Sequence, residues 1–261
     1  MELFAPALGQ ADLFLLAFTR VLGLCVTAPL LSNRLVPATL RVALAAVVAA
    51  AVLPALRTAA PAAAPGLLPL AGETLLELAT GMLIGFATTL VFAAVQLGGE
   101  LLDIDLGFAL ATVLDPVGGT ALPLVGNLQH LIALLLYLGL NGHHVLLRTI
   151  AASYGALPIG GLSPGAAAHA QLTAMAAALF SGAVALVAPA LATLWLTSLA
   201  LGLVNRAVPQ LNVFINGLSA KLLVGLAAVA LSLPLFANVW ERLLTVAQGN
   251  VAQLVRLLGG G

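Results

Sequence analysis

The chain has 261 residues, of which 62% are hydrophobic and 7% charged, and 9 basic and 9 acidic residues leave it with no formal net charge. A soluble domain is usually about 45–50% apolar and about 25% charged, so this composition excludes an ordinary soluble enzyme as well as a disordered chain. The zero net charge offers no electrostatic footprint for nucleic acid. The single cysteine, Cys25, excludes an internal disulfide.

Long apolar runs follow one another along the chain, separated by charges and by turns that contain Gly or Pro. The runs are continuous and rich in Ala and Leu, which predicts helices, because both residues are good helix formers. The second run is shorter than the roughly 20 residues that a spanning helix needs. In chain order the expected segments are 13–31, 42–56, 78–99, 122–147, a long helix from about residue 172, 213–239 and 240–258.

The last of these segments differs from the others because its apolar residues form one helical stripe. Trp240, Leu244, Val251 and Leu258 belong to this stripe, which predicts an amphipathic helix that ends at the terminal glycines. The predicted fold is therefore all-α. We expect a polytopic hydrophobic helical-hairpin membrane protein with about six long helices plus a C-terminal amphipathic helix.

Basic residues give these segments no orientation in a membrane. If six segments alternate across a bilayer, equal numbers of basic residues fall on the two sides, so the positive-inside rule decides nothing. Burial against protein partners would explain this layout. The two sets are Arg34, Arg41, Arg206 and Lys221 on one side, and Arg57, Arg148, Arg242 and Arg256 on the other.

Several ionisable residues lie within or beside the apolar runs, namely Arg20, Glu73, Glu77, Glu100 and Lys221. A charge inside a membrane costs about 2.5–3.5 kcal/mol on insertion scales, so such a residue usually has a partner or lines an aqueous path. Glu73 and Glu77 share a helix face and repel each other unless a cation meets them. The pattern indicates an interface or a water path without deciding between them.

Gly81 and Gly85 form a small-xxx-small pair inside the third run. Small residues at this spacing let two helix backbones approach closely, so we expect both glycines to serve helix packing.

The sequence carries little that points to catalysis or metal binding. His143 and His144 are neighbours and would point about 100° apart on a helix, which makes a shared metal ion difficult. Asp103 and Asp105 could hold a divalent cation, but residues two apart face away from each other on a helix, so an interfacial acidic segment is the favoured reading. No nucleophile elbow or phosphate-binding loop occurs. We therefore expect no enzyme, no cofactor and no metal.

Ordered motifs give the chain a family resemblance along nearly its whole length. They are Arg20–Gly23, Ala28–Leu30, Arg34–Pro37 with Arg41, Gln96–Glu100, Asp105–Gly107, Asp115-Pro116, Asn141–His143, Ser153, Leu157–Gly160 and Gly202–Phe214. In this order and spacing they resemble the FliR family, the export-gate subunit of the bacterial flagellar type III secretion system. The Asn-Gly-His form is more typical of flagellar members than of their counterparts in virulence injectisomes.

This resemblance implies an assembly and a place in the cell. FliR-like subunits join FliP-like and FliQ-like subunits in a pore-forming assembly, contact an FlhB-like switch subunit and pass unfolded flagellar proteins. The expected location is the bacterial inner membrane, within the flagellar basal body. The chain is then a single FliR-like membrane domain over residues 1–261, with a FliP-like half over about 1–165 and a FliQ-like hairpin half over 166–261.

The resemblance also implies a pore plug between Gly107 and Pro116. The apolar candidates are Phe108, Leu110, Val113 and Leu114. An apolar constriction blocks water and ions by dewetting, yet it yields to a passing chain. The alternative is that 108–114 is simply the start of a helix packed on its neighbours. The glycines expected to act as gate hinges are Gly107, Gly118 and Gly119.

Charged residues are the expected contacts with neighbouring subunits. Glu100, Asp103 and Asp105 would pair with cations on adjacent subunits, and Lys221 joins this set as an ionisable residue inside an apolar run. Arg206 would belong to a hairpin tip that meets the FlhB-like or FliQ-like neighbour.

Two other functions remain open at this point. A polytopic secondary transporter of a small solute would explain buried charges and Gly or Pro breaks. An injectisome export-gate homologue would share the same fold.

Overall fold

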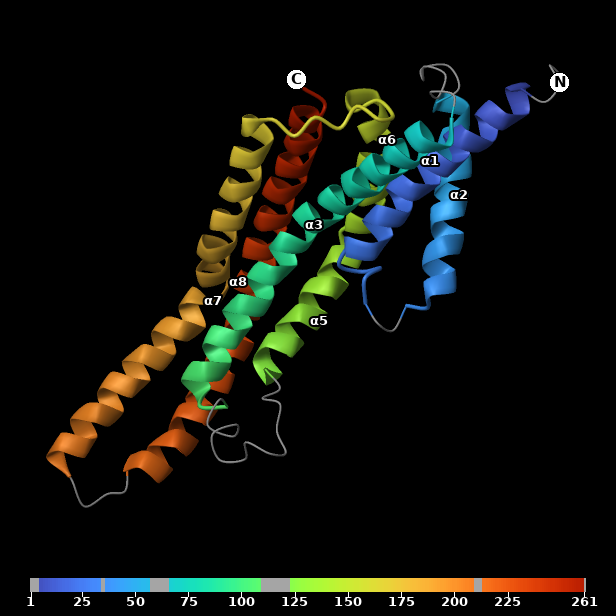
Figure 1. Ribbon diagram of the computed structural model, residues 1–261. Coiled ribbons are helices and arrows are strands. Elements are labelled where there is room, and N and C mark those ends of the chain that lie inside the picture. The colour runs from blue at the N-terminus through green and yellow to red at the C-terminus, as the bar shows by residue number, and fades with distance from the viewer. Residues whose placement is uncertain (1–4, 34–35, 57–65, 109–122, 209–212, 261) are drawn as a thin grey trace. The chain divides into compact units, whose positions relative to one another are not determined.

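The computed structural model of the chain describes residues 5–33, 36–56, 66–108, 123–208 and 213–260. Within these ranges every regular element is an α-helix, as Figure 1 shows, and the all-α prediction is confirmed. The helices are α1 (Ala5–Thr27), α2 (Ala38–Leu56), α3 (Leu67–Leu106), α5 (Leu124–Gly139), α6 (Gly142–Ala156), α7 (Ala166–Ala207) and α8 (Val213–Leu258).

Five of the described helices are long and apolar enough to cross a membrane: α1, α2, α3, α7 and α8. The helices α5 and α6 pass the same test only as a pair, with a short break between them. With 40, 42 and 46 residues, α3, α7 and α8 are about twice as long as one span requires. The membrane character predicted from composition is thus borne out by helices of spanning length.

The predicted run 122–147 forms two helices, because the chain turns at Asn141. This residue is left-handed, with φ of 56°, a conformation that ends a right-handed helix and that Asn tolerates better than most residues. Leu140 N–H closes α5 by donating to Leu136 O at 2.8 Å, and the carbonyl of Asn141 accepts the first bonds of α6. The Asn-Gly pair is therefore a helix break.

The predicted sixth run and the amphipathic tail form the single helix α8. No Gly or Pro lies between Pro234 and Gly249, so nothing ends the helix at the predicted boundary between Val239 and Trp240. Pro234 lies within α8 and removes one backbone donor without stopping it. Trp240 is buried while Glu241 is exposed, in keeping with the predicted stripe.

Packing divides the chain into two compact units, and the first combines residues 1–90, 141–176 and 246–261. We call it unit 1. Its core includes Leu24 from α1, Ile84 from α3, Ile150 from α6 and Leu254 from α8. All four side chains are fully buried. The two ends of the sequence thus share one core.

The second compact unit, which we call unit 2, combines residues 91–140 and 177–245. The ring of Phe92 on α3 lies edge-on to Tyr137 of α5 and Trp240 of α8, with ring centroids 5.4 and 4.9 Å apart. Gly182 of α7 lies against Leu243 of α8, and Gly225 of α8 lies against Leu194 of α7. In this pairing the early part of one helix meets the late part of the other, so α7 and α8 run antiparallel within unit 2.

Candidate functional site

Arg20 and Glu77 form a buried ion pair in unit 1 that joins α1 to α3. Arg20 Nε donates to Glu77 Oε2 at 2.5 Å, and the Nη2 atom donates to Oε1 at 2.9 Å. The two side chains are 0% and 1% exposed. Two parallel bonds are a strong geometry between a guanidinium and a carboxylate. Each of these two charges therefore has its partner inside the chain.

The same ion pair binds α6 and the segment after it. Arg20 Nη1 donates to Ser153 Oγ and to Leu157 O, both at 3.1 Å. Glu77 Oε1 also accepts the backbone N–H of Gly160 at 2.9 Å. Buried charges are tolerated when further hydrogen bonds satisfy their remaining donors and acceptors, and these bonds do so. The network connects three helices and one loop of unit 1.

Tyr154 completes this network from α6. Its ring lies under the guanidinium of Arg20, with 4.2 Å between Cζ and the ring centroid, and its hydroxyl donates to Ala17 O at 3.0 Å. The sequence predicts that Arg20 and Glu77 need partners, but no local spacing links them to one another or to Tyr154. Their pairing depends on how α1, α3 and α6 pack.

Asp103, near the end of α3, binds the start of α5 within unit 2. Its Oδ1 accepts the N–H of Val125 and its Oδ2 accepts the N–H of Gly126, each at 2.9 Å. Residue Pro123, which precedes α5, makes no side-chain cap. The first N–H groups of a helix have no partner inside it. Asp103 therefore caps α5 from another helix, and its carboxylate is used within the chain.

Asp105 and Lys221, both predicted to contact other subunits, contact each other in unit 2. Lys221 Nζ donates to Asp105 Oδ1 at 2.6 Å, and both side chains are partly exposed. Glu100 is exposed and accepts a bond from Gln96 Nε2 at 3.1 Å. Their contact with neighbouring subunits stays a prediction.

Arg206 lies in the last turn of α7 and is exposed. A cation is favourable there because the carbonyl end of a helix is partially negative. The following residues of the predicted hairpin tip, 209–212, lie outside the described residues. The role of Arg206 at a subunit contact is likewise a prediction.

The predicted plug begins directly after α3. Gly107 has φ of 90°, which suits Gly alone, and the N–H of Phe108 donates to Asp103 O at 3.0 Å. The side chain of Phe108 is half-buried. The other predicted plug and hinge residues lie outside the described residues: Leu110, Val113, Leu114, Gly118 and Gly119.

Gly81 and Gly85 of α3 lie directly against α1. A side-chain carbon on Gly81 would overlap Arg20 O, and one on Gly85 would overlap the Thr27 hydroxyl. The Thr89 hydroxyl, one turn further, donates to Thr27 O at 2.6 Å. The two helices approach so closely here that neither glycine position has room for a side chain.

Metal-ligating side chains are not brought together in the described part of the chain. No group of three or more His, Cys, Asp or Glu residues there is placed to hold a metal ion. The rings of His143 and His144 lie beside each other, with centroids 4.2 Å apart.

These features define a polytopic all-α membrane protein in which the buried charges of the described residues, Arg20, Glu77 and Asp103, have partners within its own helix packing. Residues 11–247 match the family described as bacterial export proteins, family 1. The chain belongs to that family, and its predicted resemblance is confirmed.

Individual relatives carry the comparison further. The flagellar biosynthetic protein FliR of Escherichia coli (strain K12) is 33% identical over 95% of this chain and 94% of its own length. FliR of Bacillus subtilis (strain 168) is 32% identical over 94% of this chain and 95% of its own length. The surface presentation of antigens protein SpaR of Shigella flexneri is 27% identical over 58% of each chain.

Proposed function

We propose that the chain is a core subunit of the flagellar type III protein export gate. With FliP-like and FliQ-like subunits it forms the channel through which unfolded flagellar proteins leave the cell, in the inner membrane at the flagellar basal body. In this proposal it is part of a passage and catalyses no reaction. The observation that carries the proposal is the match to flagellar FliR proteins over more than nine-tenths of both chains.

The outer surface of the helices supports an assembled state. The side chains of Leu196, Leu199 and Leu203 on α7 are 67%, 67% and 69% exposed, and Leu231 on α8 is 83% exposed. Such surfaces need lipid or protein around them. The antiparallel packing of α7 and α8 in unit 2 also suits a FliQ-like hairpin within 166–261, preceded by a FliP-like half over about 1–165.

The segment between α3 and α5 is the part that we assign to the plug of the closed channel. Phe108, Leu110, Val113 and Leu114 would supply the apolar seal. Support comes from both flanks, because Gly107 has a conformation that only Gly adopts easily, and Asp103 binds the first turn of α5. Gly118 and Gly119 are the further hinge candidates.

Contacts with neighbouring subunits are assigned first to the charges that remain exposed. Glu100 and Arg206 are exposed, whereas Asp103, Asp105 and Lys221 already have partners inside the chain. We therefore expect Glu100 and Arg206 to lead these contacts, with an FlhB-like or FliQ-like neighbour at Arg206.

Co-expression tests the proposal. The chain is produced with the FliP-like and FliQ-like subunits of a flagellated bacterium, purified in detergent and weighed by native mass spectrometry. A discrete hetero-oligomer that contains this chain is expected. In a strain lacking its own FliR, the chain is expected to restore flagellin secretion when it is supplied with these partners.

A chain that stays alone in the presence of these subunits contradicts the proposal and returns attention to a solute transporter. The match to SpaR adds a further arm. If the chain assembles only with injectisome subunits, the flagellar assignment is wrong while the export-gate assignment stands.

A further inference from the structure

Four side chains with rings pack together inside unit 2. Phe92 of α3 is the central residue, and its ring contacts His130 and Tyr137 of α5 and Trp240 of α8. The centroids of these three rings lie 5.8, 5.4 and 4.9 Å from the centroid of the Phe92 ring. We call the four residues the Phe92 cluster. Three helices of one compact unit therefore meet at this cluster.

Each of the three outer rings carries a buried polar atom that no described residue hydrogen-bonds. These atoms are His130 Nδ1, the Tyr137 hydroxyl oxygen and Trp240 Nε1. Tyr137 is 2% exposed and Trp240 is 0% exposed. A buried Tyr hydroxyl or Trp N–H usually has a partner, because a polar group that leaves water without one raises the free energy of the folded state. The cluster therefore calls for a ligand that forms hydrogen bonds.

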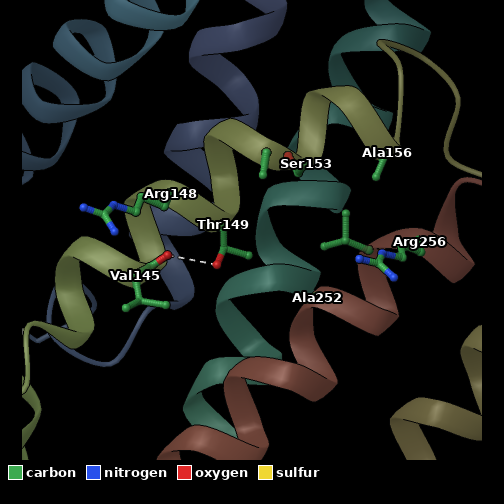
Figure 2. Close-up of a pocket in the computed structure, with 9 residues that line it drawn as sticks. Val145, Arg148, Thr149, Ser153, Ala156, Ala252 and Arg256 are labelled. Carbon is green, nitrogen blue, oxygen red and sulfur yellow. Dashed lines mark hydrogen bonds between the residues drawn. The ribbon is translucent and has the colours of Figure 1, made fainter.

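Other hydroxyl groups of the chain bind protein acceptors directly. In unit 1 the hydroxyl of Tyr154 donates to Ala17 O at 3.0 Å. Beside a hollow between α6 and α8, the hydroxyl of Thr149 donates to Val145 O at 2.9 Å, and Figure 2 marks this bond with a dashed line. Tyr137 is more deeply buried than Tyr154, which is 8% exposed, yet its hydroxyl has no acceptor in the described part of the chain.

The chemistry of the three atoms selects water as the ligand. The indole N–H of Trp240 can only donate, whereas an imidazole nitrogen and a phenol can donate or accept. The cluster contains no carboxylate, lysine or arginine to balance the charge of an ion. Its burial keeps out the side chains of other subunits. Water both donates and accepts, and folded proteins hold roughly one buried water per 27 residues, usually on polar groups without a protein partner.

We infer that the Phe92 cluster binds buried water, which joins α5 to α8 beside α3. The water accepts the N–H of Trp240 and the hydroxyl of Tyr137, and it donates to Nδ1 of His130. Helix α5 is thus held in two ways within unit 2, because Asp103 binds its first turn directly and water connects its later turns to α8. This inference uses contacts of unit 2 alone and does not depend on the proposed export function.

Ultraviolet resonance Raman spectroscopy of Trp240 tests the inference, because one indole band reports the hydrogen bonding of Nε1. The chain has two tryptophans, and Trp195→Phe removes the other one, which is 59% exposed. In the purified full chain with this substitution, Trp240 is expected to show the band of a hydrogen-bonded N–H. Its fluorescence is expected to resist quenching by acrylamide. Together these results place a hydrogen-bond partner where bulk solvent does not reach.

Tyr137→Phe, added to Trp195→Phe, removes one of the groups that hold the water. The Trp240 band is expected to shift toward that of a free N–H. The melting temperature in detergent is expected to fall by about 2–4 °C, because the water and its other partners lose a hydrogen bond.

Tyr154→Phe in the same background is the matched control, because it makes the same chemical change in unit 1. It removes the direct bond to Ala17 O, so the melting temperature is expected to fall here too. The Trp240 band is expected to stay unchanged. Circular dichroism of each variant confirms that the helices are intact.

Three results would overturn the inference. The first is the band of a free N–H at Trp240 in the Trp195→Phe chain, which would leave the indole in contact with rings alone. The second is a Trp240 band that Tyr137→Phe does not change, since the two groups would then share no water. The third is a higher melting temperature in Tyr137→Phe, as expected when a buried hydroxyl without any partner is removed. If Tyr137→Phe does not fold, the band of the Trp195→Phe chain decides.

Discussion

Among single residues of unit 1, Arg20 and Glu77 are expected to tolerate substitution least. Both are fully buried, and the guanidinium contacts a carboxylate, a hydroxyl, a carbonyl and an aromatic ring. A buried charge that loses its partner stays desolvated without compensation, whereas an apolar replacement of both partners can be tolerated. The two residues are therefore expected to respond very differently to single and to paired substitution.

Glu77→Gln is expected to destabilise the chain by about 3–5 kcal/mol, because it leaves the Arg20 charge buried and unpaired. Unfolding in detergent, followed by circular dichroism, measures this change. Glu73→Gln is the matched control, one turn earlier on α3, since Glu73 forms no ion pair in the described residues. Its effect is expected to be small. Equal losses in the two variants would contradict the role given to the ion pair.

Asp103→Asn keeps the size of the side chain but replaces one of its two acceptor oxygens by a donor. It is expected to cost about 1–3 kcal/mol, the range for leaving a buried hydrogen-bonding group unsatisfied. Hydrogen exchange is expected to accelerate at the amides of Val125 and Gly126. Asp105→Asn, whose partner Lys221 is partly exposed, is the comparison and should cost less than about 1 kcal/mol. Unchanged exchange at α5 would rule out the cap.

At the scale of elements, the contact of α1 with α3 depends on the absence of side chains. Gly81→Ala places a carbon against Arg20 O and is expected to destabilise the chain by about 1–3 kcal/mol through overpacking. Gly72→Ala, also on α3, meets nothing within 4 Å and should be neutral or stabilising by up to about 1 kcal/mol. Thermal unfolding of the two variants side by side measures the difference. Similar melting temperatures would show that the helices separate easily.

Sequence patterns predict the helices better than they predict which helices contact each other. Continuous Ala- and Leu-rich runs predict the helices, and the Gly81–Gly85 spacing indicates a close helix contact. The same patterns do not predict that Asn141 divides one apolar run into two helices, because its effect depends on a left-handed backbone. They also do not pair Arg20 with Glu77 or Asp105 with Lys221. Both pairs join helices that are distant in sequence, so only tertiary packing brings them together.

At the scale of the whole molecule, buried and exposed leucines have different roles: the buried ones stabilise the fold, and the exposed ones are available for assembly. Leu199 on α7 is 67% exposed, whereas Leu194, on the same helix, is fully buried. The first side chain contributes little to the stability of the isolated chain. In the proposed export gate, it is available to a neighbouring subunit.

Leu199→Asn is therefore expected to change the stability of the isolated chain by no more than about 0.5 kcal/mol. It is expected to reduce the yield of the complex with FliP-like and FliQ-like subunits. Leu194→Ala, by contrast, is expected to destabilise the isolated chain itself by about 2–5 kcal/mol, because Leu194 is buried. Unfolding of each purified variant and native mass spectrometry of each co-expressed complex provide the two readouts. A complex that forms normally with Leu199→Asn would place this surface in lipid.

The division of unit 1 over both ends of the sequence has a consequence for biosynthesis. Its core needs Leu254 and Leu258, which follow the last residue of the family match, and it also needs Leu24 of the first helix. Leu24 is synthesised long before Leu258. The packing of α1 in unit 1 therefore cannot be completed until the end of α8 has been translated. A premature stop codon shortly after residue 247 would leave α1 and α3 without the last turns of α8.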